Sequence, residues 1–116
     1  MNLLTTLTLV LVAIFALLGS AKLLAVPAMQ ARAAHVGFSV VAYRRIGALE
    51  LTGAVGLLAG MAVPALQTAA SVGLLLLLVG AVAAHLRAGD GIKGAAPAVV
   101  VAILVAGLIA LAARQL

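Results

Sequence analysis

The sequence predicts an all-α membrane protein, a four-helix bundle with a short interfacial helix after the first span. Hydrophobic residues make up 67% of the 116 residues and charged residues only 8%. A soluble domain needs about a quarter of its residues charged, so the composition excludes a water-soluble globule. The apolar residues also fall into runs of membrane-spanning length, which is about 20 residues. The short chain excludes a large catalytic domain and predicts a single domain over residues 1–116.

The first span is predicted at about residues 3–25, where only hydroxyl-bearing side chains interrupt the apolar run before Lys22. Such hydroxyls can bond back to helix carbonyls, so they are tolerated in lipid. A cleaved signal peptide is the alternative interpretation of this segment. It has no basic region before the apolar run, and the run is too long, so we expect it to remain as a helix of the bundle.

Residues from about 27 to 37 are too few to cross a bilayer, and we predict a short interfacial helix there. Pro27 suits the first turn of such a helix. Arg32 and His35 would share one face, with Met29 on the opposite side, as expected for a helix lying at a membrane surface. An ordered loop is the alternative for this segment.

Three further spans are predicted at about residues 42–63, 67–86 and 95–113. Ser39 can cap the first of these, because its hydroxyl can accept a backbone N–H. Pro64 and the turn around Gly89 separate the three spans. Pro97 is expected in the first turn of the last span, where its missing N–H costs little.

The distribution of basic residues predicts the orientation of the chain. The connections after the first and third spans hold all but one of them, namely Lys22, Arg32, Arg44, Arg45, Arg87 and Lys93. The other side holds only Arg114. The positive-inside rule therefore predicts that the basic side faces the cytoplasm and that both termini lie outside. Because the basic residues lie between apolar runs, we interpret them as topology signals and expect no nucleic-acid partner.

Several kinds of chemistry are excluded by absent residues and motifs. The chain has no cysteine, which excludes disulfides, thiolate metal sites and cysteine redox chemistry. It also lacks the glycine-rich nucleotide-binding motifs and the H-E-x-x-H zinc motif. We expect no metal site.

Glu50 is the residue whose position is most costly. It lies about 10 Å into the second predicted span, where a carboxylate is unfavourable unless it is paired or protonated. Small residues recur around it at three- and four-residue steps, including Gly47 and Gly60. Such residues let helices approach closely, so Glu50 is expected on a packing face and not toward lipid. The third span carries a similar stripe with Gly73 and Gly80.

The polar residues of the spans and their ends are expected to converge in the cytoplasmic leaflet. We predict a ligand-binding set of Lys22, Tyr43, Arg45, Glu50, His85, Arg87 and Asp90, in which Glu50 and His85 are also candidate catalytic groups. A purely structural interpretation stays open. In it Glu50 pairs with Lys22 or Arg45, Tyr43 anchors the interface, and His85 belongs to a solvated helix end.

The segment from Arg44 to Leu57 follows the pattern R-x-I-G-x-L-E-x-x-G-x-x-G-L and resembles the DoxX-like family of small bacterial membrane proteins. The resemblance implies a four-helix fold in the bacterial inner membrane. The broader group includes a subunit associated with thiosulfate:quinone oxidoreductase and members associated with oxidative-stress membrane complexes. The family's recurrent polar positions fall on Lys22, Arg45, Glu50, His85, Arg87 and Asp90. Without cysteine, this chain cannot run thiol chemistry itself.

Three functions are consistent with these observations. The first is a binding or accessory subunit that holds a lipophilic small molecule, such as a quinone, in a polar-lined pocket, with a membrane oxidoreductase as partner. The second is a small membrane enzyme that uses Glu50 as general acid or base on a hydrophobic substrate. The third is a homo-oligomeric transporter or pore.

Overall fold

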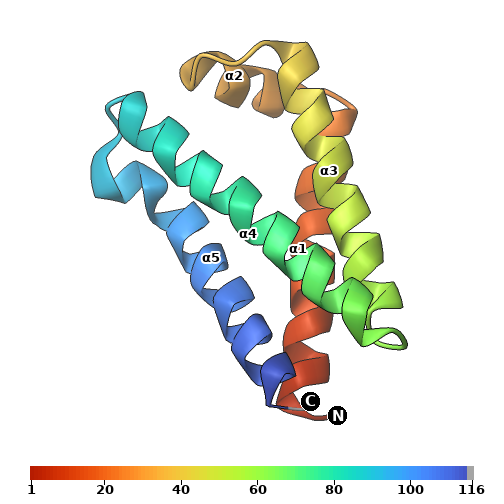
Figure 1. Ribbon diagram of the computed structural model, residues 1–116. Coiled ribbons are helices and arrows are strands. Elements are labelled where there is room, and N and C mark those ends of the chain that lie inside the picture. Colours follow the sequence, from red (N-terminus) through yellow and green to blue (C-terminus); the bar gives the residue numbers. More distant parts are fainter. Residues whose placement is uncertain (115–116) are drawn as a thin grey trace.

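The fold is all-α, as predicted. A computed structural model describes residues 1–114, and this part of the chain contains no strand. The helices are α1 (Leu3–Leu23), α2 (Pro27–His35), α3 (Val40–Ala59), α4 (Pro64–Arg87) and α5 (Gly91–Ala113), as Figure 1 shows. The predicted short helix after the first span is therefore confirmed as α2.

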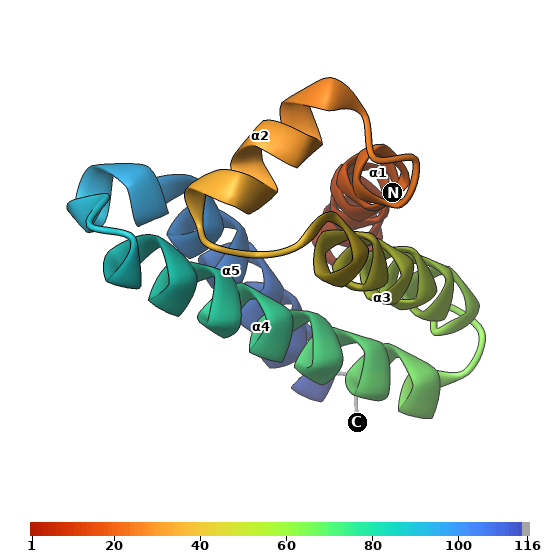
Figure 2. The same ribbon diagram turned by 90° about the horizontal axis from the view of Figure 1, so that it is seen from above.

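The four long helices form two antiparallel pairs. The most extensive helix contact joins α1 to α3, followed by the contact of α4 with α5, and α4 packs on α3. Both termini lie at one end of the bundle, whereas α2 and the turn between α4 and α5 lie at the other end (Figure 1). Figure 2 shows α2 lying across that end. All four long helices contribute to one apolar core, which includes Phe15, Leu57, Leu74 and Leu108.

Three helices, α1, α4 and α5, are long and apolar enough to cross a membrane. Large apolar side chains on their outer faces, such as Leu17, Leu76 and Ile103, are mostly exposed, which suits contact with lipid. The α3 helix has 20 residues but carries two arginines and Glu50. Because of these charges, α3 does not belong to this group of three. Its crossing of the bilayer therefore remains a prediction.

The signals read from the sequence match most of the helix ends. Pro27 and Pro64 each lie at the start of a helix. Gly37, which follows α2, has a φ of +80°, a conformation that favours glycine. The Ser39 hydroxyl accepts a hydrogen bond from the backbone N–H of Ala42 at 3.0 Å and so caps α3.

The predicted start of the last helix is wrong. The α5 helix begins at Gly91 and not at about residue 95, so Pro97 lies inside the helix and not in its first turn. Gly89, with a φ of +84°, reverses the chain within a few residues of the end of α4. The α5 helix thus begins before the apolar run starts, so hydropathy does not predict its first turn.

The contact between α1 and α3 depends on a glycine on each helix. A Cβ atom added to Gly47 would lie 2.6 Å from the carbonyl oxygen of Gly19 and 2.8 Å from the backbone nitrogen of Leu23. A Cβ on Gly19 would lie 2.9 Å from the carbonyl oxygen of Gly47. The two backbones therefore touch, as small residues allow in membrane helices.

The predicted glycine face of α3 is used in packing, but that of the third span is not. Gly60 lies against Gln67, and Gly56 lies against Ala70, so both support the contact of α3 with α4. Within the described chain, an added Cβ on Gly73 or Gly80 meets nothing within 4 Å. These two glycines lie on an exposed face of α4.

We expect Gly47→Ala to destabilise the protein by about 1–3 kcal/mol, because the new methyl group would push against backbone that cannot rotate away. The matched control is Gly107→Ala in α5, where the added Cβ meets no atom within 4 Å in residues 1–114. It should leave stability unchanged or raise it by up to about 1 kcal/mol through helix propensity. Unfolding in mixed detergent micelles, followed by circular dichroism, measures both. Equal effects of the two variants would contradict the close crossing.

Candidate functional site

Glu50 lies on the inner face of α3 and forms an ion pair with Lys22 of α1. It is only 4% exposed, and its Oε1 lies 2.5 Å from Lys22 Nζ. Lys22 follows Gly19 by three residues, and Glu50 follows Gly47 by three residues. Residues three apart share a helix face, so the glycine crossing brings the lysine and the carboxylate together. The structure therefore pairs Glu50 with Lys22 and not with Arg45.

The Tyr43 ring covers the ammonium group of this pair. Lys22 Nζ lies 5.3 Å from the ring centroid, within the range of a cation–π interaction. The Phe38 ring packs edge-on against Tyr43, with 6.3 Å between the ring centroids. Lys22, Tyr43 and Glu50, which we call the α1–α3 cluster, are thus the part of the predicted set that the structure brings together around Glu50.

Two arginines open α3 beside this cluster, and both are exposed. Arg44 donates from Nε to the backbone carbonyl of Leu23 at the end of α1, at 3.0 Å. Within residues 1–114, Arg45 makes no hydrogen bond or ion pair with Glu50. The predicted role of Arg45 beside Glu50 is therefore not reflected in a direct contact.

A second cluster joins α2 to the turn between α4 and α5. Asp90 accepts a hydrogen bond from His85 Nδ1 at 2.7 Å and one from His35 Nε2 at 2.6 Å. These hydrogen bonds hold the pKa of the Asp90 carboxyl below its ordinary value of 3.8, and the bond from His85 has the larger effect. We call His35, His85 and Asp90 the histidine cluster. The sequence predicts His35 on a helix at the membrane surface, and its separation from Asp90 in sequence gives no signal of this contact.

The predicted convergence of polar residues therefore separates into two clusters. In the described part of the chain, no hydrogen bond or ion pair links the α1–α3 cluster to the histidine cluster. Arg87 is exposed and belongs to neither. No group of three or more His, Asp or Glu side chains in residues 1–114 is arranged to hold a metal ion.

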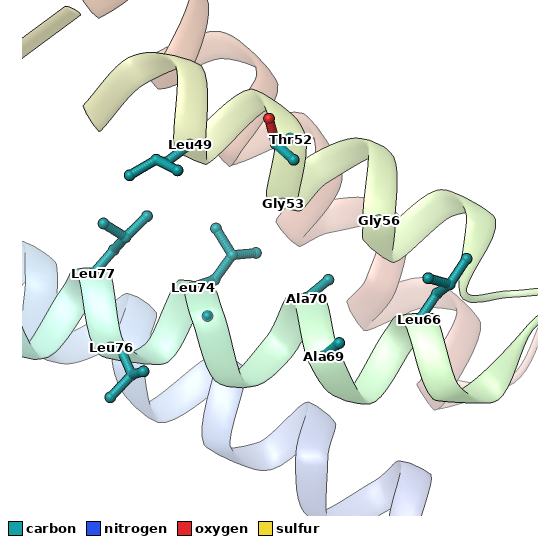
Figure 3. A pocket seen from close by; sticks show the side chains of 11 residues that line it. Leu49, Thr52, Gly53, Gly56, Leu66, Ala69, Ala70, Leu74, Leu76 and Leu77 are labelled. Atoms are coloured by element: carbon teal, nitrogen blue, oxygen red, sulfur yellow. The ribbon is translucent and has the colours of Figure 1, made fainter. Parts of the chain in front are cut away.

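A groove of about 520 Å³ lies between α3 and α4. Figure 3 shows Leu49 of α3 opposite Leu74 and Leu77 of α4. The Thr52 hydroxyl, which is the polar side-chain group of the lining, already donates to the Ala48 carbonyl at 2.8 Å. The walls are otherwise leucine, alanine and glycine.

A smaller cavity of about 190 Å³ lies between the end of α1 and the first turns of α3. It is lined by Leu23, Val41, Arg44, Arg45 and Ala48. Of the predicted ligand-binding residues, only Arg45 lines either of these two cavities. Sequence reasoning missed the groove itself, because its lining is ordinary for a membrane helix.

The sequence model of the DoxX-like family matches residues 6–107 of the chain. That range includes all of α2, α3 and α4 and most of α1 and α5. This chain belongs to the DoxX-like family. No curated protein and no solved structure matches it. The family and the three apolar helices together identify a DoxX-like membrane protein, as the resemblance implied.

We expect Lys22→Met and Glu50→Leu each to destabilise the DoxX-like protein by about 3 kcal/mol, because each leaves a buried charge without its partner. The double variant Lys22→Met/Glu50→Leu should recover most of that loss, since it buries no unpaired charge. A double-mutant cycle of unfolding free energies in detergent measures the coupling. Arg45→Met, which removes an exposed charge, is the control and should change little. Additive losses in the double variant would show that the two residues are not coupled.

The histidine cluster should make the stability of the fold depend on pH in the acidic range. Because the folded-state pKa of Asp90 is lowered, its contribution is present above its ordinary pKa of 3.8 and is lost as pH falls through the lower folded value. We expect the melting temperature of the parent protein to exceed that of Asp90→Asn near neutral pH. The difference should shrink as the pH is lowered through this range. A difference that stays constant down to the most acidic condition would contradict the assignment.

Proposed function

We propose that this protein is a binding or accessory protein that holds a lipophilic small molecule, such as a quinone, in the groove between α3 and α4. The observation that carries the proposal is the groove itself, about 520 Å³ in volume with almost wholly apolar walls. Pockets for small molecules are commonly about 300–1,000 Å³ and mostly apolar with a few polar groups. The groove has the size and lining for such a ligand.

Glycines of α3 contribute to the floor of the groove. A Cβ on Gly53 would lie 2.5 Å from the Leu74 side chain, and one on Gly56 would lie 2.8 Å from the Ala70 side chain. The helices therefore approach closely at the floor, while larger side chains such as Leu49 form the walls. Leu49 is 54% exposed, so the walls face the surroundings of the bundle. A lipophile in the bilayer could enter the groove from the side.

A polar contact to the ligand is available at Thr52. Its hydroxyl donates to the Ala48 carbonyl, which leaves oxygen lone pairs to accept a hydrogen bond from a ligand hydroxyl. Hydrogen bonds between the ligand and Glu50 or His85 remain a prediction. Each already has a partner, Lys22 and Asp90 respectively, and neither residue lines the groove.

A small membrane enzyme is the alternative proposal, and the buried carboxylate of Glu50 is the observation that favours it. A general acid or base must come within hydrogen-bond reach of a substrate. Glu50 lines neither of the two cavities described above, so this reaction would require the pair with Lys22 to open. We therefore rank binding first.

We further propose a location in the bacterial inner membrane with both termini outside. All basic residues except Arg114 belong to the end of the bundle that carries α2 or to the helix ends next to it. The positive-inside rule assigns such an end to the cytoplasm. A membrane oxidoreductase or a second copy of the chain remains the proposed partner class.

Two glycine variants of α4 test the binding proposal. We expect Gly73→Leu to fill the groove and to reduce co-purifying lipophile at least about tenfold, the loss expected when about 1.4 kcal/mol of binding is removed. Gly73 lines the groove, and an added Cβ there meets no atom within 4 Å in the described chain, so the protein should still fold. Gly80→Leu, on the same helix and equally open but outside the groove, is the matched control.

Mass spectrometry of lipophiles extracted from each purified variant provides the measurement. The control should retain the specific lipophile of the parent protein at an unchanged molar ratio. The proposal would be overturned if no specific lipophile co-purified with the parent, or if both variants retained it equally.

A further inference from the structure

The smaller cavity has an almost wholly apolar floor, and two arginines border it. Leu23 comes from the end of α1, and Val41 and Ala48 come from successive turns of α3. Arg44 and Arg45 line the same cavity of about 190 Å³. It shares no lining residue with the groove between α3 and α4, so the two cavities can be tested separately.

One of the arginines is held in place by the backbone. Arg44 donates its Nε–H to the Leu23 carbonyl at 3.0 Å, across the junction between α1 and α3. This bond uses one of the five N–H donors of the guanidinium and leaves the terminal nitrogens for another acceptor. The carbonyl that anchors Arg44 belongs to a residue that lines the cavity, so the charged group is fixed at its rim.

Within residues 1–114, no acid pairs with these arginines. The chain contains two acidic residues, and Glu50 is paired with Lys22 while Asp90 is bonded to His35 and His85. In the part of the chain that the structure describes, neither Arg44 nor Arg45 forms an ion pair. Two adjacent exposed cations without an internal counter-ion favour an anion from outside. Guanidinium groups suit phosphate in particular, because they can donate two parallel hydrogen bonds to it.

The position of the cavity indicates which phosphate this is. Arg44 and Arg45 lie in the first two turns of α3, at the end of the bundle that carries α2. Exposed apolar side chains of α3 continue beyond them toward the middle of the bundle, for example Leu49. A molecule with a phosphate at one end and a hydrocarbon chain at the other matches this order along the helix.

We propose that the cavity binds an anionic phospholipid, with its phosphate on Arg44 and Arg45 and an acyl chain on Leu23 and Ala48. The phosphate supplies the counter-ion that the chain lacks. The acyl chain covers apolar surface between α1 and α3. A lipid bound there bridges the two helices that Lys22 and Glu50 join from the inside.

The test compares lipid binding by the full chain with that of charge variants. Purified protein is incubated with phosphatidylglycerol or phosphatidylcholine, and lipid adducts are counted by native mass spectrometry. We expect phosphatidylglycerol to be retained preferentially, and Arg44→Gln/Arg45→Gln to lose about tenfold or more of that retention, given the strength of charge-assisted hydrogen bonds. The matched control, Arg32→Gln/Lys93→Gln, removes two exposed charges from the same end and should keep it.

A second variant tests the apolar floor with both arginines intact. Ala48→Phe should fill the cavity and reduce retention of phosphatidylglycerol to a similar extent, and because Ala48 is exposed the variant should fold. Circular dichroism confirms the fold of every variant. Inorganic phosphate is added as a competitor, and it should fail to displace the lipid because it lacks the acyl chain.

Three results would overturn the proposal. The first is equal retention of phosphatidylglycerol and phosphatidylcholine by the parent protein. The second is an equal loss in the two charge variants, which would indicate a diffuse effect of positive charge. The third is displacement of the lipid by inorganic phosphate, which would indicate a site for the free anion. All three are independent of what occupies the groove between α3 and α4.

Discussion

The ion pair between Lys22 and Glu50 is the interaction on which the rest of the structure depends. It lies one helical turn from the contact between Gly19 and Gly47, where the backbones of α1 and α3 touch. A buried carboxylate is unfavourable without a partner, so the two helices gain most when they cross at this point. The crossing also positions Tyr43 over the ammonium group. Close packing and charge pairing thus support the same arrangement of α1 and α3.

The α1–α3 cluster and the histidine cluster together shape the character of the remaining surface. Both acidic residues of the chain already have partners, Glu50 with Lys22 inside the bundle and Asp90 with two histidines at the turn between α4 and α5. What remains outside is apolar on the long helices and positive near α2. Such a surface suits lipophilic and anionic lipid ligands and is poorly suited to chemistry that needs a free carboxylate. Because both acids already have partners, we favour binding in the groove and at the arginines over catalysis at Glu50.

The features predictable from the sequence were those with a local cause. Apolar runs predicted the long helices, a proline and an amphipathic pattern predicted α2, and the glycines around Glu50 predicted its inward orientation. The start of α5 was missed because Gly91 to Gly94 join the helix without joining the apolar run. The contact of His35 with Asp90 was missed because it depends on how α2 lies across the end of the bundle. The groove between α3 and α4 depends on the angle between the two helices, and this angle cannot be predicted from the types of the lining residues.

Solid-state nuclear magnetic resonance of the protein in lipid bilayers tests the central ion pair most directly. The chain has one glutamate and two lysines, so labelling the glutamate carboxyl with ¹³C and the lysine side chains with ¹⁵N isolates a single carboxyl signal. Lys93→Arg leaves only the Lys22 ammonium in view. We predict a ¹³C–¹⁵N dipolar coupling that corresponds to direct contact between the two groups. A Glu50 carboxyl with no coupling to any lysine nitrogen would contradict the account.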